Sequence, residues 1–515
     1  MAIKTIIRKN TYFDSVSLMT LSAKANSVEG VKQVNIAMGT TMNKDVLKNT
    51  GLLQKEAEDA KPGDLLIVIE GEEGYEMDTL LKNVEEVMER KNQQEDDKEV
   101  TYSSIEAAVK QHQEAKVAVI SVPGPYAARV AGKALREGLH VMMFSDNVSL
   151  EDEIALKKEA HEKGLLMMGP DCGTAILNGK GLCFANEVRR GSIGIVAASG
   201  TGAQEVSVRV HDFGGGVSHL IGTGGRDLSK EVGGIMMLDG IRALQEDEDT
   251  KIIILVSKPP AKEVADKIYE VVKKSEKPIV ICFLGGKKDE IEASGAVYAK
   301  TTKRAALQAV ILSGVAEETI NKHSLNLELI EEVKAKLNPE QKYIRGLFCG
   351  GTICSEVAYL VKEQVGEVYS NISKDPSYNL GNLEDSKGHT FIDFGDDSFT
   401  QGRPHPMIDP SLRLERILKE ARDPEVGVIA IDMILGYGAH MDPVGATLPA
   451  IKEAKKIAEE AGRHLEILAF VLGTELDPQV FDDQVERLMA EGVTISSSSE
   501  NTGLLSRGFI SKEEN

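Results

Sequence analysis

The sequence is poor in cysteine, and its few cysteines do not form the pairs that disulfide frameworks or zinc sites use. There are five, spread over the chain without a C-x-x-C pair: Cys172, Cys183, Cys282, Cys349 and Cys354. Such spacing signals neither a disulfide framework nor a zinc site. We therefore expect no metal site, and we interpret most of these thiols as buried packing residues.

Basic residues and long apolar runs are also scarce. Lys and Arg number 60 against 81 Asp and Glu, which gives a net charge of -21. This charge repels phosphate backbones and anionic lipids, so neither nucleic acid nor a membrane is an expected partner. No apolar stretch approaches the about 18 residues of a membrane span, and residues 1–8 are too short and strand-like for a signal peptide. A cytoplasmic protein is expected.

Length and apolar content indicate several α/β domains. The 515 residues, 42% of them hydrophobic, suit roughly three domains of about 150 residues each. Six short apolar runs separated by helical segments predict one doubly wound sheet in a first domain, residues 1–188. These runs are residues 3–7, 34–38, 64–69, 117–122, 141–144 and 165–168. The loop at residues 10–15 contains no glycine, which argues against a standard NAD or FAD site.

One stretch is typical of a strand that turns into a ligand-binding helix. An apolar run at residues 191–198 stops at Ser199-Gly200-Thr201-Gly202, and an amphipathic segment follows. Glycines there let a ligand approach the backbone, and free N–H groups at a helix start attract an anion. We interpret this motif as a phosphate or carboxylate site. An ordinary strand-to-helix turn with a Ser or Thr cap is the alternative.

The same motif recurs, which indicates an internal repeat. Gly200-Thr201-Gly202-Ala203-Gln204-Glu205-Val206 is followed later by Gly351-Thr352-Ile353-Cys354-Ser355-Glu356-Val357. Three further stretches match in the same order: 221–227 with 392–397, 251–256 with 426–431, and 279–285 with 467–473. Ordered matches of this kind predict two copies of one flavodoxin-like α/β domain, residues 189–328 and 340–515. The second copy then offers a second anion site at Gly350, Gly351 and Thr352.

The second copy also carries an unusual loop at residues 401–406. Prolines on both sides of His405 keep its backbone extended and stiff. A rigid loop that presents Arg403 and His405 suits an anionic substrate, although a plain surface turn is an alternative.

Three motifs resemble the α subunit of succinyl-CoA synthetase. They are Gly169-Pro170-Asp171-Cys172-Gly173, Ser199-Gly200-Thr201 and Gly222-Thr223-Gly224-Gly225. Residues 391–396 and 435–438 are similar to the carboxy-terminal domain of its β subunit. The resemblance implies an α/β protein with a Rossmann-like, CoA-binding-type domain followed by two ligase domains with parallel sheets. No cofactor is certain, and CoA is a possible one.

A second resemblance spans essentially the whole chain. Residues 10–19, 169–174, 393–397 and 403–410 resemble the FdrA family. This resemblance implies a subunit of an oxamate carbamoyltransferase, which converts oxalurate and phosphate into oxamate and carbamoyl phosphate in purine breakdown. It also implies companion protein subunits, a homo-oligomer, or both.

The chain departs from the synthetase pattern at the residue that carries phosphate. Those ligases phosphorylate a histidine in Gly-His-Ala-Gly, and the matching stretch here is residues 292–295, with Ala293 at the histidine position. The resemblance includes no ATP-grasp half that would supply a nucleotide. A ligase that works through phosphohistidine is therefore disfavoured. The design that survives is a pair of opposed helix starts that hold phosphate or an acyl phosphate.

These observations predict a site for phosphate and a small anionic substrate. Phosphate is assigned to Ser199, Gly200, Thr201, Gly202, Gly224, Gly225, Gly350, Gly351 and Thr352, and the substrate to Pro170, Asp171, Cys172, Gly173 and Asp396. Arg226 and Arg403 are candidate partners of a carboxylate, and His405 is a candidate acid or base near neutral pH. The alternatives are a CoA ligase or acyl phosphate to CoA transferase, and a non-catalytic scaffold or regulatory subunit.

Overall fold

The computed structural model divides the chain into two compact units, residues 1–103 and 104–515. It describes residues 3–9, 11, 18, 21–22, 25–26, 28, 30–40, 43–44, 47–48, 52–61, 63–71, 74–90, 101–400 and 403–511. The predicted loop at residues 10–15, apart from Thr11, and the first two residues of the 401–406 loop lie outside these ranges.

The first unit is a small antiparallel sheet with helices. Its elements are β1 (Ile3–Arg8), β2 (Val31–Met38), α3 (Lys55–Glu58), β3 (Leu65–Gly71) and α4 (Met77–Arg90). The strand order is β1-β3-β2, and β3 pairs antiparallel with both neighbours. All seven residues of β3 are buried, as expected for the central strand of a small sheet.

This sheet corrects one prediction from the sequence. The six apolar runs of residues 1–168 do form strands, but they lie in two different sheets and not in one doubly wound sheet. The first three pair antiparallel in the first unit, and the last three pair in parallel in the second. The prediction was wrong because alternating strand and helix patterns do not specify which strands pair, or in which direction.

The second unit begins with a short parallel sheet. Its elements are α5 (Ile105–Gln111), β4 (Val117–Ile120), α6 (Gly124–Arg136), β5 (His140–Met143), α7 (Leu150–Glu162) and β6 (Met167–Met168). The strands are ordered β4-β5-β6. Helix α6 begins at Gly124, where a Cβ atom would lie 2.3 Å from the backbone oxygen of Asp146. Glycine is therefore required where this helix meets the next loop.

The following residues form the first lobe, residues 174–312. Its elements are β7 (Thr174–Leu177), β8 (Lys180–Cys183), β9 (Arg190–Ala198), α8 (Gly200–Asp212), β10 (Val217–Gly222), α9 (Ile235–Glu246), β11 (Ile252–Ser257), α10 (Lys262–Val272), β12 (Ile279–Phe283), α11 (Lys288–Ala293), β13 (Val297–Tyr298) and α12 (Thr302–Leu312). The order is β13-β12-β11-β9-β10-β7-β8. The five strands from β9 to β13 are parallel and follow the flavodoxin order, and the β7–β8 hairpin adds an antiparallel edge.

The second lobe, residues 343–510, follows a linking segment with η1 (Glu317–Thr319) and α13 (Leu327–Lys336). Its elements are β14 (Tyr343–Phe348), α14 (Gly351–Val365), β15 (Val368–Ser370), β16 (His389–Asp393), α15 (Asp397–Thr400), α16 (Ser411–Glu420), β17 (Val426–Ile434), α17 (Pro443–Glu460), β18 (Glu466–Leu472), α18 (Phe481–Ala490), β19 (Thr494–Ser496) and α19 (Ser499–Ile510). The order is β15-β16-β14-β17-β18-β19, and every strand pair is parallel.

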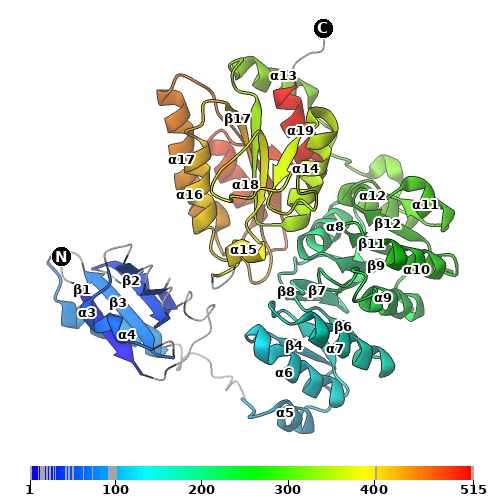
Figure 1. The fold of residues 1–515 in the computed structure, drawn as a ribbon, viewed down its shortest axis with the longest axis horizontal. Coiled ribbons are helices and arrows are strands. Elements are labelled where there is room, and N and C mark those ends of the chain that lie inside the picture. Colours follow the sequence, from blue (N-terminus) through cyan, green and yellow to red (C-terminus); the bar gives the residue numbers. More distant parts are fainter. Residues whose placement is uncertain are drawn as a thin grey trace. The chain divides into compact units, whose positions relative to one another are not determined.

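The two lobes confirm the predicted duplication. Strands β9, β10, β11, β12 and β13 occupy the same places in their sheet as β14, β16, β17, β18 and β19 in theirs. Both sheets are covered by helices on both faces (Figure 1). Their central strands are correspondingly apolar, and all nine residues of β17 are buried. The fold class predicted for this part, two flavodoxin-like domains with parallel sheets, is confirmed.

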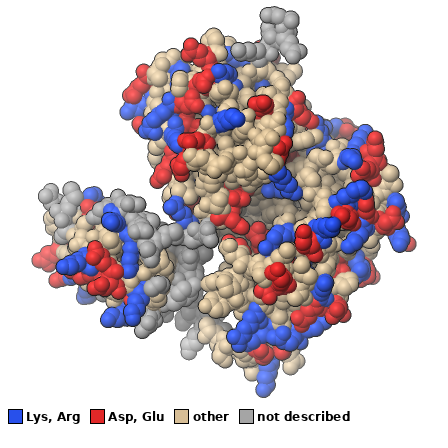
Figure 2. All heavy atoms as spheres, in the orientation of Figure 1, with Lys and Arg blue, Asp and Glu red and all other residues tan. Residues whose placement is uncertain are grey.

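The surface carries charge of both signs. Figure 2 shows acidic and basic side chains interspersed over the visible face. Among the helices that the structure describes, none combines the length and the apolar character that crossing a bilayer requires.

Candidate functional site

The N-termini of α8 and α14 meet where the two lobes pack together. We call them the two helix tips, Ser199–Gly202 and Gly350–Ile353. Ser199 Oγ caps α8 by accepting a hydrogen bond from Gly202 N at 2.9 Å, whereas Gly350 offers α14 no side-chain cap. Ser199 Oγ also lies 2.5 Å from Thr352 Oγ1 of the other lobe. The predicted opposition of two equivalent helix starts is therefore present.

Glycines allow this close approach, and they do so reciprocally. A Cβ atom added at Gly350 would lie 2.9 Å from Thr201 Cγ2, and one at Gly202 would lie 2.9 Å from Thr352 Cγ2. Both distances are too short for a real Cβ contact. Each tip thus needs a glycine where the threonine of the opposite tip packs.

Several backbone donors at the tips find no acceptor among the described residues. These are the N–H groups of Gly200 and Thr201 on α8, and of Gly351, Thr352 and Ile353 on α14. Each helix N-terminus carries the equivalent of about half a positive charge. Two such ends with free donors form a favourable place for one small anion.

A buried ion pair holds the tip of α14 in place. Asp432, on β17, is fully buried and accepts hydrogen bonds from Cys349 N at 2.9 Å and Gly350 N at 3.1 Å. Arg413 Nη1 donates to the same carboxylate at 2.8 Å. Because both partners are buried, this pair fixes the backbone just before α14.

Two glutamates, one on each helix, lock the lobes together one turn further along. Glu356 on α14 accepts hydrogen bonds from Thr302 N at 2.8 Å, in the first lobe, and from Ser499 Oγ at 2.6 Å. Glu205 on α8 accepts one from Ser499 N at 3.2 Å, in the second lobe. Burial raises the pKa of Glu356 to about 7 and also raises that of Glu205. Each glutamate thus caps a helix of the opposite lobe.

The sequence analysis missed a lysine and an aspartate beside the tips. A Cβ atom added at Gly351 would lie 2.4 Å from Asp393 Oδ2 and 3.5 Å from Lys258 Nζ. Asp393 ends β16 of the second lobe and is 5% exposed, while Lys258 directly follows β11 of the first lobe. Burial raises the pKa of Asp393 to about 6, and the Lys258 ammonium opposes this shift. Both residues lie at carboxyl ends of parallel strands, where ligands bind in open α/β sheets, so this position was the available signal.

The predicted substrate loop, residues 170–173, lies beside the tip of α8. A Cβ atom at Gly200 would lie 4.0 Å from Gly173 Cα, and one at Gly224 would lie 2.3 Å from the oxygen of Pro170. Gly224 has a φ of 82°, so a side chain there would also be strained. The structure therefore brings the loop, Gly224 and the tip of α8 together. A Cβ at Gly225 would lie 3.9 Å from Asp171 Oδ2.

Two residues of this loop differ in chemistry. Asp171 is exposed to solvent, yet surrounding protein displaces much of its water. This desolvation, together with the carboxylates of Asp397 and Asp146, raises its pKa to about 7. Cys172 is buried and lies 3.6 Å from the oxygen of Thr174, and burial raises the pKa of its thiol to about 12. Cys172 therefore packs as a neutral thiol.

The two predicted arginines are placed differently. Arg226 Nε forms a 2.9 Å ion pair with Glu153, and its Nη2 donates to the oxygen of Val148 at 2.8 Å. Its guanidinium is thus already engaged, although the side chain is 48% exposed. Arg403 is exposed, and its side chain contacts no charged partner among the described residues.

His405 lies beside the turn that follows β16. Its ring is 5.6 Å from that of Phe184, and a Cβ atom at Gly395 would lie 2.7 Å from its Nε2. Desolvation lowers its pKa to about 4, so the imidazole is neutral near pH 7. The role of an acid or base near neutral pH, which the sequence suggests for His405, stays a prediction. Asp396, in the same turn, accepts hydrogen bonds from Ser398 N and Oγ at 3.1 and 2.6 Å.

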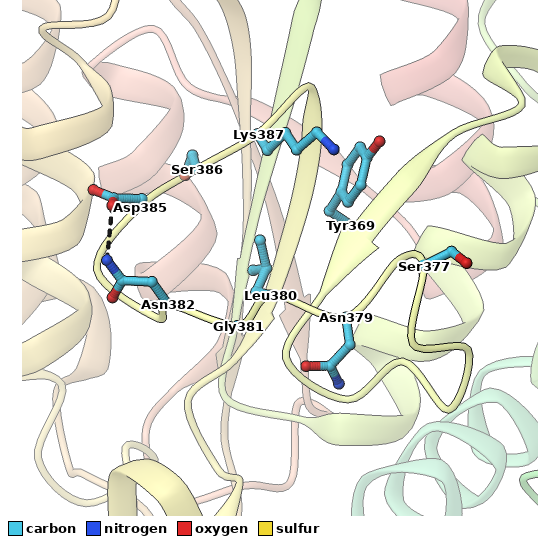
Figure 3. Close-up of a pocket in the computed structure, with 9 residues that line it drawn as sticks. All are labelled: Tyr369, Ser377, Asn379, Leu380, Gly381, Asn382, Asp385, Ser386 and Lys387. Carbon is cyan, nitrogen blue, oxygen red and sulfur yellow. Dashed lines mark hydrogen bonds between the residues drawn. The ribbon is translucent and has the colours of Figure 1, made fainter.

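A separate pocket lies in the second lobe, formed by Tyr369 of β15 and the segment that connects β15 to β16. It has a volume of about 210 Å³ and is lined by Tyr369, Ser377, Asn379, Leu380, Gly381, Asn382, Asp385, Ser386 and Lys387. Figure 3 shows Lys387 beside the ring of Tyr369, and Asn382 bonded to Asp385 across from them. Lys387 Nζ lies 4.3 Å from the ring centroid. Asn379 and Ser386 bond to residues outside the lining, so most polar groups of this pocket are already engaged.

Three family models match the chain. The first, described as AllF, heavy metal-associated domain, matches residues 1–103; a CoA binding domain matches residues 188–285; and CoA-ligase matches residues 347–507. The CoA binding match falls on the first lobe, whereas the resemblance to the synthetase implied a CoA-binding-type domain in residues 1–188.

The heavy-metal description does not fit the residues present. Residues 1–103 contain no cysteine and no histidine, so they offer such a metal neither a thiolate nor an imidazole ligand. No group of three or more His, Cys, Asp or Glu residues in the described part of the chain could hold a metal ion.

The N-termini of α6 and α8 differ in whether they could hold a phosphate group of CoA. At α6, Pro123 and Pro125 supply no N–H, and the backbone of the next loop fills the space at Gly124. At α8, the N–H groups of Gly200 and Thr201 find no acceptor among the described residues and fit one phosphate group of CoA as well as inorganic phosphate. CoA is accordingly a possible ligand of the first lobe.

Individual relatives agree with the family models. Uncharacterized protein YahF of Escherichia coli K12 is 57% identical over 514 residues, covering 100% of both chains. Succinate-CoA ligase (ADP-forming) subunit alpha 2 of Archaeoglobus fulgidus is 27% identical over 183 residues, covering 35% of this chain and 62% of that protein. An ATP citrate lyase structure from Methanothrix soehngenii, in complex with citrate and coenzyme A, is 14% identical. The match covers 79% of this chain and 83% of that chain, with a TM-score of 0.37. The chain belongs to the family of YahF, with an AllF-type domain followed by CoA-binding and CoA-ligase domains.

Proposed function

We propose that the chain is a CoA-ligase-like acyl transferase that exchanges an acyl group between a donor and phosphate without a phosphohistidine. Phosphate binds beside the contact between the two helix tips, where the N–H groups of both are free. One of its oxygens attacks the carbonyl carbon of the donor, the bond from that carbon to the leaving group breaks with its electron pair, and the leaving group takes a proton. The products are an acyl phosphate and the protonated leaving group.

The observation that carries this proposal is the meeting of the tips, with Ser199 Oγ 2.5 Å from Thr352 Oγ1. Free N–H groups from both lobes surround this contact. They are suited to neutralise phosphate and to stabilise the oxyanion that develops on an attacked carbonyl. Ala293, an exposed residue at the end of α11, occupies the place of the phosphorylated histidine, so the proposal routes phosphate directly to the acyl group.

A CoA thioester is the donor that the comparisons support. Two of the family models and the succinate-CoA ligase relative point to CoA-dependent chemistry. CoA supplies a thiol as the acyl carrier when bound. With a CoA thioester as the donor, the residues of this chain hold the phosphate and exclude water. The free N–H groups of Gly200 and Thr201, which fit one phosphate group, support CoA as a ligand.

Oxalurate is the second candidate donor, and the AllF-type domain over residues 1–103 favours it. The similarity to FdrA implies this substrate, with carbamoyl phosphate and oxamate as products. Arg403, which is exposed and lacks a charged partner among the described residues, would receive the substrate carboxylate. Arg226 would have to share its guanidinium with Glu153. His405 would act as a neutral hydrogen-bonding group.

The proposal includes companion subunits and a cytoplasmic location. The five cysteines are all unpaired, which suits a reducing compartment. Companion subunits follow from the similarity to FdrA, so the assay should use the chain together with the proteins that copurify with it.

The test traps acyl phosphate with hydroxylamine, which gives a hydroxamate from succinyl phosphate and hydroxyurea from carbamoyl phosphate. Mass spectrometry measures the trapped product, and the product formed without phosphate is subtracted because hydroxylamine also reacts with the thioester. The chain and its copurifying subunits are supplied with succinyl-CoA or oxalurate, each with and without inorganic phosphate. We expect phosphate-dependent trapped product with one donor. Ser199→Ala should lower the rate at least about tenfold, since it removes the hydroxyl at the tips.

Ser149→Ala is the matched control. Ser149 caps α7 by accepting from Asp152 N at 3.1 Å, so its loss removes a similar helix cap away from the tips. This variant should keep the wild-type rate. If neither donor gives phosphate-dependent product and the chain binds no phosphate, the acyl transferase proposal fails and a scaffold role takes its place.

A further inference from the structure

The two lobes are duplicates, but the side chains that follow equivalent strands beside the helix tips differ between them. By the strand registers, Asp393 of the second lobe corresponds to Gly222 of the first, and Lys258 of the first corresponds to Ile434 of the second. A Cβ atom at Gly222 would lie 2.5 Å from Cys172 Sγ, so no side chain fits there. Ile434 is apolar and buried at the end of β17. The symmetric N–H groups are therefore accompanied by one cation and one acid, both beside α14.

These two side chains are close to the tip but are not bonded to each other. Both lie next to Gly351, the first residue of α14. Asp393 Oδ1 accepts from Gly395 N at 2.9 Å, while its Oδ2 finds no donor among the described residues. Lys258 Nζ likewise finds no acceptor there and forms no ion pair within 4.0 Å. An acid that is 5% exposed, with one oxygen unpartnered at a helix N-terminus, is an independent sign that this place receives a ligand.

We propose that Lys258 binds the phosphoryl group at the tips and that Asp393 is the catalytic proton shuttle of the exchange. This inference rests on the proposed function, because it assigns residues to that same site. As the attacking phosphate oxygen bonds to the carbonyl carbon, its proton passes to the Asp393 carboxylate. As the bond to the leaving group breaks, the same proton passes from Asp393 to that group. Phosphate, acyl donor, acyl phosphate and protonated leaving group then balance with no other reactant.

The electrostatics of the site suit this role. The charged and titratable groups that act on Asp393 are Lys258 after β11, Asp396 in the following turn and Asp432 on β17. Asp171 of the substrate loop also interacts electrostatically with Asp393. So do the thiols of Cys349 and Cys354, before and within the first turn of α14. The neutral ring of His405 lies beside Gly395. Burial raises the pKa of Asp393 to about 6. A general acid or base works best when its pKa lies near the operating pH, so this carboxyl group can both accept and release a proton near neutrality.

The binding test measures the affinity of the full chain for inorganic phosphate by isothermal titration from pH 5.5 to 8. Lys258→Met, which removes the charge but keeps a side chain of similar length, should weaken binding about tenfold at pH 7. Asp393→Asn removes a carboxylate that repels phosphate above pH 6. It should therefore tighten binding about threefold at pH 8 and leave it unchanged at pH 5.5. Lys262→Met is the matched control, since Lys262 is 78% exposed on α10, and it should bind like wild type.

The kinetic test separates proton transfer from a structural role. Asp393→Asn can still accept from Gly395 N, so the turn after β16 is retained. This variant should lower kcat for phosphate-dependent formation of the trapped product about 100-fold and remove the limb of the pH profile near 6, without raising KM for phosphate. Lys258→Met should mainly raise that KM.

The outcomes distinguish the two proposals. If the wild-type chain binds no phosphate, the proposed function itself fails. If wild type binds phosphate but Lys258→Met binds equally well and Asp393→Asn leaves the pH dependence of binding unchanged, the assignment of these two residues is overturned while the phosphate site stands. A melting temperature for each variant confirms that the protein compared is folded.

Discussion

Replacing Gly350 by alanine should move the two helix tips apart and weaken the binding of phosphate by both of them. The added Cβ would lie 2.9 Å from Thr201 Cγ2 and 3.0 Å from both Thr201 Cβ and Oγ1. These atoms are close to the backbone of α8 and cannot turn away as the end of a long side chain can. The tips must therefore move apart by a few tenths of an ångström.

The cost to folding should be modest. Gly350 has φ of -114°, which alanine adopts without strain. Overpacking costs about 1–3 kcal/mol, and the reduced freedom of the unfolded chain returns about 0.4–1 kcal/mol. Hydrogen bonds to a charged group are worth about 1.5–3 kcal/mol each, so losing one of them weakens phosphate binding about 10- to 100-fold. The variant should thus stay folded and lose affinity.

Isothermal titration of phosphate into the full chain measures this loss, with Gly200→Ala as the matched control. A Cβ at Gly200 would have its nearest neighbour, Thr174 Oγ1, at 3.9 Å, which is an ordinary contact. Gly200→Ala should therefore bind phosphate like wild type. If Gly350→Ala binds phosphate as tightly as Gly200→Ala, the reasoning that both tips hold one anion is refuted.

Three further outcomes are expected. Asp432→Asn or Arg413→Met leaves a buried charge without its partner and should lower the free energy of unfolding by about 3–5 kcal/mol, measured with urea. Breaking the exposed ion pair of Lys262 and Asp266 is the control and should cost under about 1 kcal/mol. Because burial raises the folded pKa of Glu356 to about 7, its contribution to stability is present below about pH 4.5 and is lost as pH rises through 7. Glu356→Gln should therefore melt higher than wild type at pH 8 and show no such advantage at pH 4.5; equal melting temperatures at both would contradict this. Because residues 1–103 lack cysteine and histidine, the full chain should retain no zinc or copper after dialysis, and elemental analysis showing one metal per chain would overturn that conclusion.

Much of the second unit could be predicted from the sequence. The repeated Gly-Thr motifs and the ordered matches after them indicated two copies of one domain, and both sheets have the flavodoxin order. The motifs also identified the start of each leading helix. This worked because glycine and a buried apolar run constrain the local backbone strongly.

The remaining features depend on contacts between distant elements. The antiparallel sheet of β1, β2 and β3 has the same alternation of strands and helices in its sequence as a doubly wound parallel sheet. The sequence pattern therefore could not distinguish the two kinds of sheet. Lys258 and Asp393 meet only because strand ends of two different lobes come together at Gly351. The low pKa of His405 follows from desolvation beside Phe184, which no local motif encodes.

The most direct measurement is a crystal structure of the full chain grown with saturating phosphate. The account predicts one tetrahedral ion within hydrogen-bonding distance of the backbone N–H groups of both Thr201 and Thr352, with Lys258 turned toward it. Phosphate that contacts only one tip, or no phosphate at the tips when the ion is bound elsewhere on the chain, would contradict it.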